Sequence, residues 1–468
     1  MPQNSAPSLW GLLADDGGLR ASRFLADEDT RVHLATLRQY TTLDVDPAEL
    51  SERSILIRSN RQLTAALALI ELDGIARRVI ICPPDLAPRY LTGVVDAAAV
   101  DAVVAEVPGD EIGPPRHYVT CRPNIFAPCH RQKRGRETEW ILFTSGTTGA
   151  PKMVVHTLAT LVGPLARVRA LGKEAVWSTF YDIRRYGGLQ VLLRALVAHG
   201  SMVFSDGHGD PAAFLARAAA AGVSYISGTP SHWRRTLMSP GGQGFSPAYV
   251  RLSGEVADQA VLDKLKARFP QAKVAHAFAS TEAGLAFEAE DGLAGFPAHF
   301  VGDVRRPAEL RVKDGSLHVR SGRTALRYLG DDAKALADAE GFVDTGDLLE
   351  LRRDRYHFAG RREGVINVGG LKVNPEQVEA VINQHPQVAM SVVHGRRNPI
   401  TGALVVADIV VKASTADDRS ANASTKKTID EVLALCRQNL EPHQVPTSIR
   451  VVPSIEIAAS GKIGRIHA

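Results

Sequence analysis

The chain has 468 residues, 45% of them hydrophobic and 23% charged, a profile typical of a globular protein with two or three domains. A net charge of +4, with no face-sized run of Lys and Arg, argues against a nucleic-acid-binding surface. No apolar stretch is long enough to span a bilayer, and no leader-peptide pattern follows Met1. The four cysteines show no metal-ligand spacing and suit a reducing compartment, so we expect a cytoplasmic protein.

Short apolar runs alternate with segments of helical periodicity from about residue 55 onward. Ile55–Ile57 and Val79–Ile81 are predicted to be buried strands, with Leu63–Leu72 as a packed helix between them. This alternation is typical of an α/β fold. The first fifty residues carry a weaker pattern and receive no assignment.

A polar, glycine-containing segment follows the apolar strand predicted at Trp140–Phe143. Glycines let backbone N–H groups approach phosphates, hydroxyls donate further hydrogen bonds, and a lysine adds charge. The density of such residues favours a polyphosphate cradle over a polar surface turn. It is not a Walker A loop, because Pro151 interrupts the Gly-Lys-Ser/Thr pattern. The candidate residues are Thr144, Ser145, Gly146, Thr147, Thr148 and Lys152.

Further polar turns follow later strands of the same domain. Ser224–Ser227 is predicted to be a strand that ends at Gly228, and Tyr249–Leu252 a strand that ends at Ser253-Gly254-Glu255. A helix with Val261, Leu265 and Phe269 on one face comes next, before a strand at Val274–Phe278. Ligands of open α/β sheets bind beyond the carboxyl ends of strands, so these turns are candidate binding positions.

The pattern changes after about residue 355. Asn374–Gln377 is a good helix start, and strands are predicted at Met390–Val393 and Leu404–Val411. Ser414–Lys427 is polar and predicts a mobile loop, followed by a helix with an apolar face. We therefore expect two domains, an N-terminal one at residues 1–359 and a small α+β domain at 360–468.

The string ILFTSGTTGAPKMVVHT, around Thr144–Lys152, resembles the phosphate-loop signature of the acyl-adenylate-forming (AMP-binding) superfamily. This superfamily includes acyl- and aryl-CoA synthetases, adenylation domains of nonribosomal peptide synthetases, and luciferases. The resemblance implies an α/β fold with a large N-terminal adenylate-forming domain and a small, mobile C-terminal α+β lid. It is strong from Trp140 to the C-terminus and weak before it; Met153 replaces a usual glycine.

Two further motifs of the large domain carry this resemblance. Phe278–Glu282 is similar to the aromatic-Gly-x-Thr-Glu motif, which implies that Phe278 stacks on adenine, Thr281 contacts the α-phosphate and Glu282 holds Mg²⁺. Taken alone, a Thr-Glu pair after a strand is more often a helix cap. Ser253-Gly254-Glu255 resembles the loop that lines the adenine pocket, and the Thr-Gly-Asp motif implies that Asp347 binds the ribose hydroxyls.

The C-terminal domain carries the remaining motifs. Gly360–Glu376 is a long match to the hinge and lid motif, which implies a nucleotide contact for Arg361, a hinge at Glu363 and a thiol tunnel beside Gly369 and Gly370. Lys372 stands where an arginine is common. Ser460–Arg465 resembles the terminal lysine motif, so Lys462 is the candidate for stabilising the transition state of the first step, with Thr281 and Glu282 as further catalytic candidates.

The resemblance implies two half-reactions with ATP, Mg²⁺ and CoA or phosphopantetheine. A carboxylate attacks the α-phosphorus of MgATP to release pyrophosphate and form acyl-AMP, and the lid then turns to admit a thiol. Many relatives have a histidine gate to the acyl pocket where this chain has Arg185. We expect a small acid that is polar or aromatic, and the candidate pocket residues are Tyr181, Arg184, Arg185, Gly188 and Gly228. Equally, Asp182 pairs with one of the two arginines for purely structural reasons.

Two alternatives stay open. The acyl group could be transferred to the phosphopantetheine of a carrier protein instead of CoA, because both thiols use the same tunnel. A non-catalytic nucleotide-binding protein on a degraded ligase scaffold is the other, favoured by Ala279 and by the missing histidine gate. The chain retains five residues that together argue against it: Lys152, Glu282, Asp347, Arg361 and Lys462. Oligomeric state is not predicted.

Overall fold

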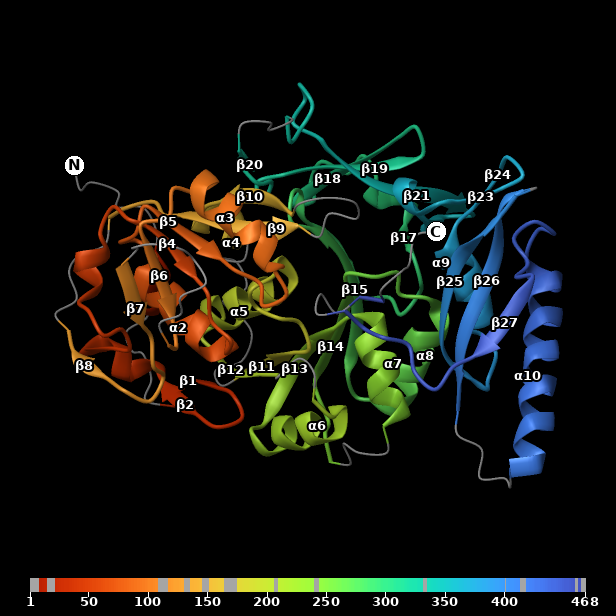
Figure 1. Cartoon of the computed structure of the whole chain (residues 1–468), viewed down its shortest axis with the longest axis horizontal. Helices are drawn as coiled ribbons and strands as arrows, with labels where there is room; N and C mark the ends of the chain where they lie inside the picture. The colour runs from red at the N-terminus through yellow and green to blue at the C-terminus, as the bar shows by residue number, and fades with distance from the viewer. Residues whose placement is uncertain are drawn as a thin grey trace.

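The computed structural model shows a large α/β part and a smaller C-terminal part that lie side by side (Figure 1). No helix among the described residues is both long and apolar enough to cross a membrane. The described residues are 8–14, 22–107, 117–129, 135–144, 151–163, 175–205, 209–239, 244–330, 335–399, 401–412, 418–458 and 462–463.

An eight-stranded sheet forms the centre of the large part, in the order β16-β15-β14-β13-β11-β12-β1-β2. Its inner strands from β1 to β15 run parallel, and β2 and β16 close the edges in antiparallel pairing. Parallel strands end at one edge of the sheet, so the turns after β13, β14 and β15 meet there. The strands are β1 (Phe24–Ala26), β2 (Arg31–His33), β11 (Val176–Thr179), β12 (Ser201–Phe204), β13 (Val223–Gly228), β14 (Tyr249–Ser253), β15 (Lys273–Ser280) and β16 (Gly284–Ala289). The helices of this region are α5 (Tyr186–Val197), α6 (Pro211–Ala220), α7 (Pro230–Met238) and α8 (Gln259–Arg268).

A seven-stranded sheet lies beside it, in the order β20-β10-β9-β5-β4-β6-β7. The strands are β4 (Ser54–Ile57), β5 (Arg78–Ile81), β6 (Ala102–Ala105), β7 (His117–Thr120), β9 (Glu139–Thr144), β10 (Lys152–His156) and β20 (Arg327–Leu329). Helix α2 (Gln62–Leu72) is buried over its whole circumference, which agrees with its nearly continuous apolar sequence. Helices α3 (Pro88–Ala97) and α4 (Leu158–Val162) complete this layer.

A five-stranded antiparallel sheet links the two large sheets to the C-terminal part. Aromatic rings pack along its inner side, with Phe358 stacked on Phe278 at 5.0 Å between ring centroids and Phe287 packed against Phe296 at 4.3 Å. These contacts fix β15, which carries Phe278, against β22. The strands are β17 (Phe296–Pro297), β18 (Ala308–Lys313), β19 (Ser316–Ser321), β21 (Val343–Arg352) and β22 (Arg355–Arg361).

The C-terminal part begins after the 3₁₀ turn Arg362–Gly364 and has its own core; we call it the lid. Its sheet has the order β24-β23-β26-β25, with β27 paired to β26. In Figure 1 the chain after β27 runs back from the lid toward the ends of β14 and β15. The elements are β23 (Ile366–Val368), β24 (Leu371–Val373), α9 (Pro375–Ile382), β25 (Val388–Asn398), β26 (Gly402–Val411), α10 (Asp418–Asn439) and β27 (Ser448–Val451).

The predicted strands and helices are confirmed, and the predicted loop at Ser414–Lys427 is wrong. Helix α10 starts at Asp418 and runs through most of that segment. Its later turns bury Thr428, Val432 and Cys436, and a helix that has already formed extends at little cost along a polar stretch. The unassigned first fifty residues contain α1 (Leu9–Ala14), β1 and β2, which join the core of the large part.

Candidate functional site

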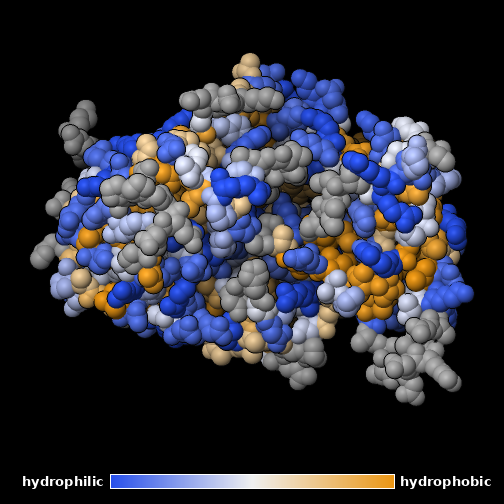
Figure 2. All heavy atoms as spheres, in the orientation of Figure 1, coloured by the Kyte–Doolittle hydropathy of each residue, from blue (hydrophilic) through white to orange (hydrophobic). Residues whose placement is uncertain are grey.

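A cleft of about 2250 Å³ lies where the large part meets the lid. Figure 2 shows this face of the molecule hollowed near its middle. The cleft is lined by the carboxyl ends of β14 and β15, the start of β10, parts of β21 and β22, helix α9, and Lys462 and Ile463 near the C-terminus. Motifs that are far apart in the sequence therefore line one cavity.

The two ends of the predicted phosphate cradle face each other at one wall of the cleft. Lys152 of β10 pairs with Thr144 of β9 in antiparallel register, so the intervening turn leaves and re-enters the sheet at adjacent positions. Both residues line the cleft. Ser145, Gly146, Thr147 and Thr148 lie outside the described residues. The Lys152 ammonium is 5.4 Å from the ring centroid of Tyr328.

Tyr328 joins Lys152 to the acidic side of the site. Its hydroxyl donates to Glu282 Oε1 at 3.5 Å, and burial together with the Glu282 charge raises the pKa of Tyr328 to about 12. No local motif marks this tyrosine in the sequence, because only the pairing of β20 with β10 brings it to the cleft. Lys152, Tyr328 and Glu282 thus lie together beside the cradle.

Thr281 and Glu282 form the turn between β15 and β16, and a buried histidine fixes that turn. His156 Nε2 lies 2.7 Å from the Thr281 carbonyl oxygen, and His156 Nδ1 lies 2.9 Å from Thr160 Oγ1. Burial lowers the pKa of His156 to about 4, so the ring is neutral and Nε2–H donates to the carbonyl. Sequence reasoning did not single out His156.

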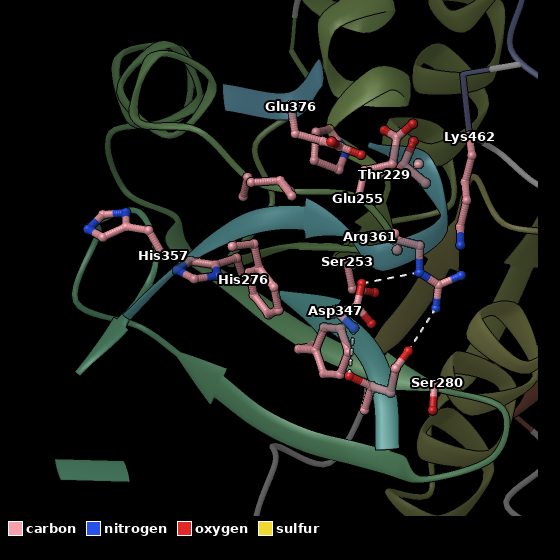
Figure 3. A pocket seen from close by; sticks show the side chains of 18 of the residues that line it. Thr229, Ser253, Glu255, His276, Ser280, Asp347, His357, Arg361, Glu376 and Lys462 are labelled. Atoms are coloured by element: carbon pink, nitrogen blue, oxygen red, sulfur yellow. Dashed lines mark hydrogen bonds and ion pairs between the residues drawn. The ribbon is translucent and has the colours of Figure 1, made fainter. Parts of the chain in front are cut away.

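The ribose candidate and the nucleotide-contact candidate are cross-strand neighbours. Asp347 on β21 is in register with Arg361 on β22, and Arg361 Nε donates to Asp347 Oδ1 at 3.3 Å. Burial raises the pKa of Asp347, and the Arg361 guanidinium opposes that shift. Figure 3 shows both side chains in the same space as Lys462.

Lys462 extends from the terminal segment into this space (Figure 3). The side chain remains accessible from the cleft, although the cleft walls surround it. Enclosure lowers the pKa of Lys462, the Arg361 charge lowers it further, and the carboxylates of Glu255 and Asp347 act in the opposite direction. The predicted catalytic lysine, the predicted ribose ligand and the predicted nucleotide contact are therefore brought together.

The loop Ser253-Gly254-Glu255 continues from the end of β14 along the cleft wall. The Tyr181 hydroxyl donates to the Ser253 carbonyl oxygen at 2.7 Å and accepts from the Ser253 N–H at 3.0 Å. Gly254 has φ +88°, and a Cβ there would lie 3.8 Å from Lys462 Cε. Phe278 also lines the cleft, and its ring stacks on the ring of Phe358.

The two arginines near the predicted acyl pocket have different environments. Arg184 is buried, makes a bidentate ion pair with Asp182 at 2.6–2.8 Å, and is not among the cleft residues. The expectation that it meets the substrate is therefore corrected, and the purely structural alternative holds for Arg184. Arg185 lines the cleft, and its Nη2 donates to Asp85. Arg185 Nε is buried and has no hydrogen-bond partner among the described residues.

Of the two predicted pocket glycines, one lines the cleft and the other does not. Gly188 lines the cleft, and a Cβ there would come within 2.3 Å of the Asp182 carbonyl oxygen, so only glycine allows this approach of α5. Gly228 ends β13 but packs behind the wall, where a Cβ would lie 2.9 Å from the Phe180 ring. Of the predicted acyl-pocket residues, the structure thus leaves Tyr181, Arg185 and Gly188 on the cleft wall.

The lid motif is divided between the cleft and the outer surface. Glu363 lies in the 3₁₀ turn between β22 and β23 and lines the cleft. Gly369 and Gly370 form the exposed turn between β23 and β24 and, like Lys372, are not among the cleft residues. In this orientation the lid presents Lys462 to the cleft and keeps its glycine turn outside.

Comparisons with known proteins agree with this arrangement. The model of the AMP-binding enzyme family matches residues 62–324, and that of the AMP-binding enzyme C-terminal domain matches residues 377–462. The 2-succinylbenzoate–CoA ligase of Listeria monocytogenes is 28% identical over 339 residues, 70% of this chain and 69% of that protein. Sulfoacetate–CoA ligase of Cupriavidus necator is 25% identical over 366 residues, 70% of this chain and 65% of that protein.

Solved structures share the fold over nearly the whole chain. A benzoate CoA ligase from Burkholderia xenovorans LB400 has a TM-score of 0.77 at 18% identity, with 97% of each chain covered. The anthranilate CoA ligase AuaEII in complex with anthranoyl-AMP has a TM-score of 0.75 at 16% identity, with 98% of this chain and 95% of that chain covered.

The lowered pKa of Lys462 has a measurable consequence that requires no substrate. At mildly alkaline pH a larger fraction of Lys462 is neutral than of an ordinary lysine, so it is acylated faster by an amine-reactive reagent. Asp347→Asn removes a charge that raises this pKa, so labelling becomes faster still. Peptide mass spectrometry across a pH series measures both rates, with exposed Lys372 as the internal reference. Labelling of Lys462 that lags behind Lys372 at every pH contradicts the enclosure argument.

Proposed function

Because the chain belongs to the AMP-binding enzyme family, it is an AMP-forming acid–CoA ligase, and we propose that its acid is small and either polar or aromatic. ATP activates the acid as acyl-AMP, and the acyl group passes to the thiol of CoA. The observation that carries the residue assignments is the entry of Lys462 from the lid into the cleft beside Asp347 and Arg361.

In the proposed first half-reaction the acid carboxylate attacks the α-phosphorus of ATP and pyrophosphate leaves. The nucleophile is already ionised, so orientation and charge stabilisation supply the rate enhancement. We assign the α-phosphate and the attacking carboxylate to Lys462 and Thr281, and the ribose hydroxyls to Asp347 and Arg361. We assign adenine to Phe278 and Ser253–Glu255, which line the cleft, and the outer phosphates to Thr144–Lys152, whose two end residues line it.

Mg²⁺ is assigned to Glu282. A single carboxylate next to a polyphosphate fits this ion, which keeps several waters and takes few protein ligands. Glu282 lines the cleft, and its turn is held by the neutral His156. When bound, Mg²⁺ neutralises charge on the phosphates and on the departing pyrophosphate.

In the proposed second half-reaction the lid turns about Glu363. This movement withdraws Lys462 and brings the Gly369-Gly370 turn to the cleft, where two residues without side chains leave room for a pantetheine arm. The 3₁₀ turn that contains Glu363 is the connection between the sheet of β22 and the lid sheet. We keep residues 359 and 360 as the proposed boundary between the domains and Lys372 as a proposed contact of the incoming thiol substrate.

The acid is assigned through Arg185. Arg185 is a hydrogen-bond donor that lines the cleft together with Tyr181 and Gly188. A substituent of the acid that accepts hydrogen bonds satisfies this donor. Two relatives are named for acids with a second anionic group, 2-succinylbenzoate and sulfoacetate, which supports a polar acid here.

Transfer to a carrier protein stays the alternative for the second step, because the thiol arm is the same. Product analysis with CoA against a phosphopantetheinylated carrier protein separates the two.

A cytoplasmic location is proposed from the four cysteines, all of them buried and none in a disulfide.

Removal of the Lys462 charge is expected to affect one half-reaction only. Lys462→Ala lowers the rate of acyl-adenylate formation, followed by ATP–pyrophosphate exchange, by about 100- to 1000-fold. Thioester formation from preformed acyl-adenylate is largely retained, because the lysine is withdrawn in that step. Equal losses in the two assays would refute the assignment, and absence of exchange by the wild-type protein over the whole acid panel would favour a non-catalytic protein.

Arg185 is expected to determine the choice of acid. In a panel of small acids matched in size, wild-type protein prefers those with a polar hydrogen-bond-accepting substituent over neutral analogues. Arg185→Gln raises KM for the preferred acids by about tenfold or more and leaves KM for the neutral ones unchanged. Arg89→Gln, an exposed arginine of α3 outside the cleft, is the matched control. A panel in which long-chain fatty acids give the highest kcat/KM contradicts the proposal.

A further inference from the structure

The side chain of Glu255 connects the large part to the segment that carries Lys462. Glu255 Oε2 accepts a hydrogen bond from the Ser231 N–H at 2.9 Å, and Glu255 Oε1 accepts one from the Ile463 N–H at 2.9 Å. Ser231 is the second residue of helix α7, where backbone N–H groups have no partner inside the helix. Ile463 directly follows Lys462. One carboxylate therefore spans a fixed helix end and the terminal segment.

The other side of the terminal segment is attached to the lid. Ile463 forms a bridge with Ile457, and the Ala458 N–H donates to the Lys462 carbonyl oxygen at 2.9 Å. Ile457 and Ile463 pack with Met390 and Val410, which belong to β25 and β26. The segment therefore moves with the lid, and its hydrogen bond to Glu255 must break when the lid turns.

Asp258, just before α8, and Lys264 of α8 provide two further contacts from the large part to the lid. Asp258 Oδ2 accepts from Asn383 Nδ2 of the lid at 3.3 Å and is also paired with Arg234 of α7. Lys264 Nζ donates to the Val388 carbonyl oxygen at the start of β25 at 3.4 Å. Both distances are long, whereas the Glu255 bond to Ile463 is short and charge-assisted. Glu255 is the strongest polar contact among these three.

We propose that Glu255 is a positioning residue that latches the terminal segment, and so the lid, in the orientation that delivers Lys462 to the cleft. This role rests on the proposed two-step function and goes beyond the adenine-side position of Glu255. A ligand or contact shifts a conformational equilibrium only through an interaction that differs between the states. The bond from Glu255 to the Ile463 N–H exists in the orientation for acyl-adenylate formation and is absent after the lid turns.

Two substitutions separate the latch from general stability. Glu255→Ala removes both acceptors, whereas Glu255→Gln keeps one carbonyl oxygen as an acceptor and loses the charge. At saturating ATP, Glu255→Ala is expected to slow acyl-adenylate formation by about ten- to a hundredfold, with a smaller loss in Glu255→Gln. Thioester formation from preformed acyl-adenylate is retained or accelerated in both. Glu290→Gln, an exposed carboxylate of the large part outside the cleft, leaves both steps unchanged.

Lid position is measured separately from catalysis, so failure of the latch and failure of the proposed function are distinguishable. Spin labels at Val304→Cys, 72% exposed, and Lys427→Cys, with a side chain 77% exposed, report the distance between the large part and the lid by electron paramagnetic resonance. The four native cysteines are buried. With ATP and Mg²⁺ bound, the spin-labelled protein is expected to populate the distance of the lid orientation that places Lys462 in the cleft. Glu255→Ala is expected to lose much of this population, and Lys462→Ala is expected to keep it.

Two results overturn the proposal. One is a distance distribution that does not change in Glu255→Ala. The other is a loss of equal size in both half-reactions at an unchanged melting temperature, which assigns Glu255 to a general role in the site. If Glu255→Ala does not fold, the same comparison is made with Glu255→Gln.

Discussion

Enclosure of a lysine cation by the walls of a cleft is the constraint from which most of the arrangement follows. An ammonium surrounded by protein loses part of its hydration, and this loss lowers the pKa of Lys462. The carboxylates of Glu255 and Asp347 raise the pKa of Lys462 again, so they help the lysine to keep its positive charge in this position. Because the lysine reaches this position from the lid, the proposed turn of the lid would remove its charge from the site.

The polar contacts inside the large part are stronger than those between the large part and the lid. Beneath the cleft, Glu288 contacts Arg251 at 2.9 Å and Arg194 at 3.3 Å, and although burial works to raise it, the two guanidiniums hold the pKa of Glu288 at about 2. This buried network ties α5, β14 and β16 into one rigid base. By contrast, the contacts of Asp258 and Lys264 with the lid are long, at 3.3 and 3.4 Å. Such a contrast suits a fixed substrate-binding surface with a cap that changes position.

The motifs could be recognised in the sequence because each one is local. Phe278–Glu282 and Arg361–Glu363 are short strings whose neighbours in the chain are also their neighbours in space, and the two ends of Thr144–Lys152 pair with each other. Tyr328 and His156 were missed because they reach the site through strand pairing and long-range hydrogen bonds, which leave no local pattern. The two possible partners of Asp182 could not be separated from the sequence, since Arg184 and Arg185 are adjacent and only the backbone turn before α5 directs them apart.

The loop after β14 is one short segment that contacts the proposed acyl side, the proposed nucleotide side and the lid. Ser253 is held by Tyr181, which lines the cleft. The positive φ of Gly254 lets the chain turn beneath the Lys462 stem without a side chain in its path. Glu255 then meets the start of α7 and the backbone beside that lysine. Since both partners of Glu255 are backbone N–H groups, no residue type at either position could have revealed the contact; it follows from the fold alone.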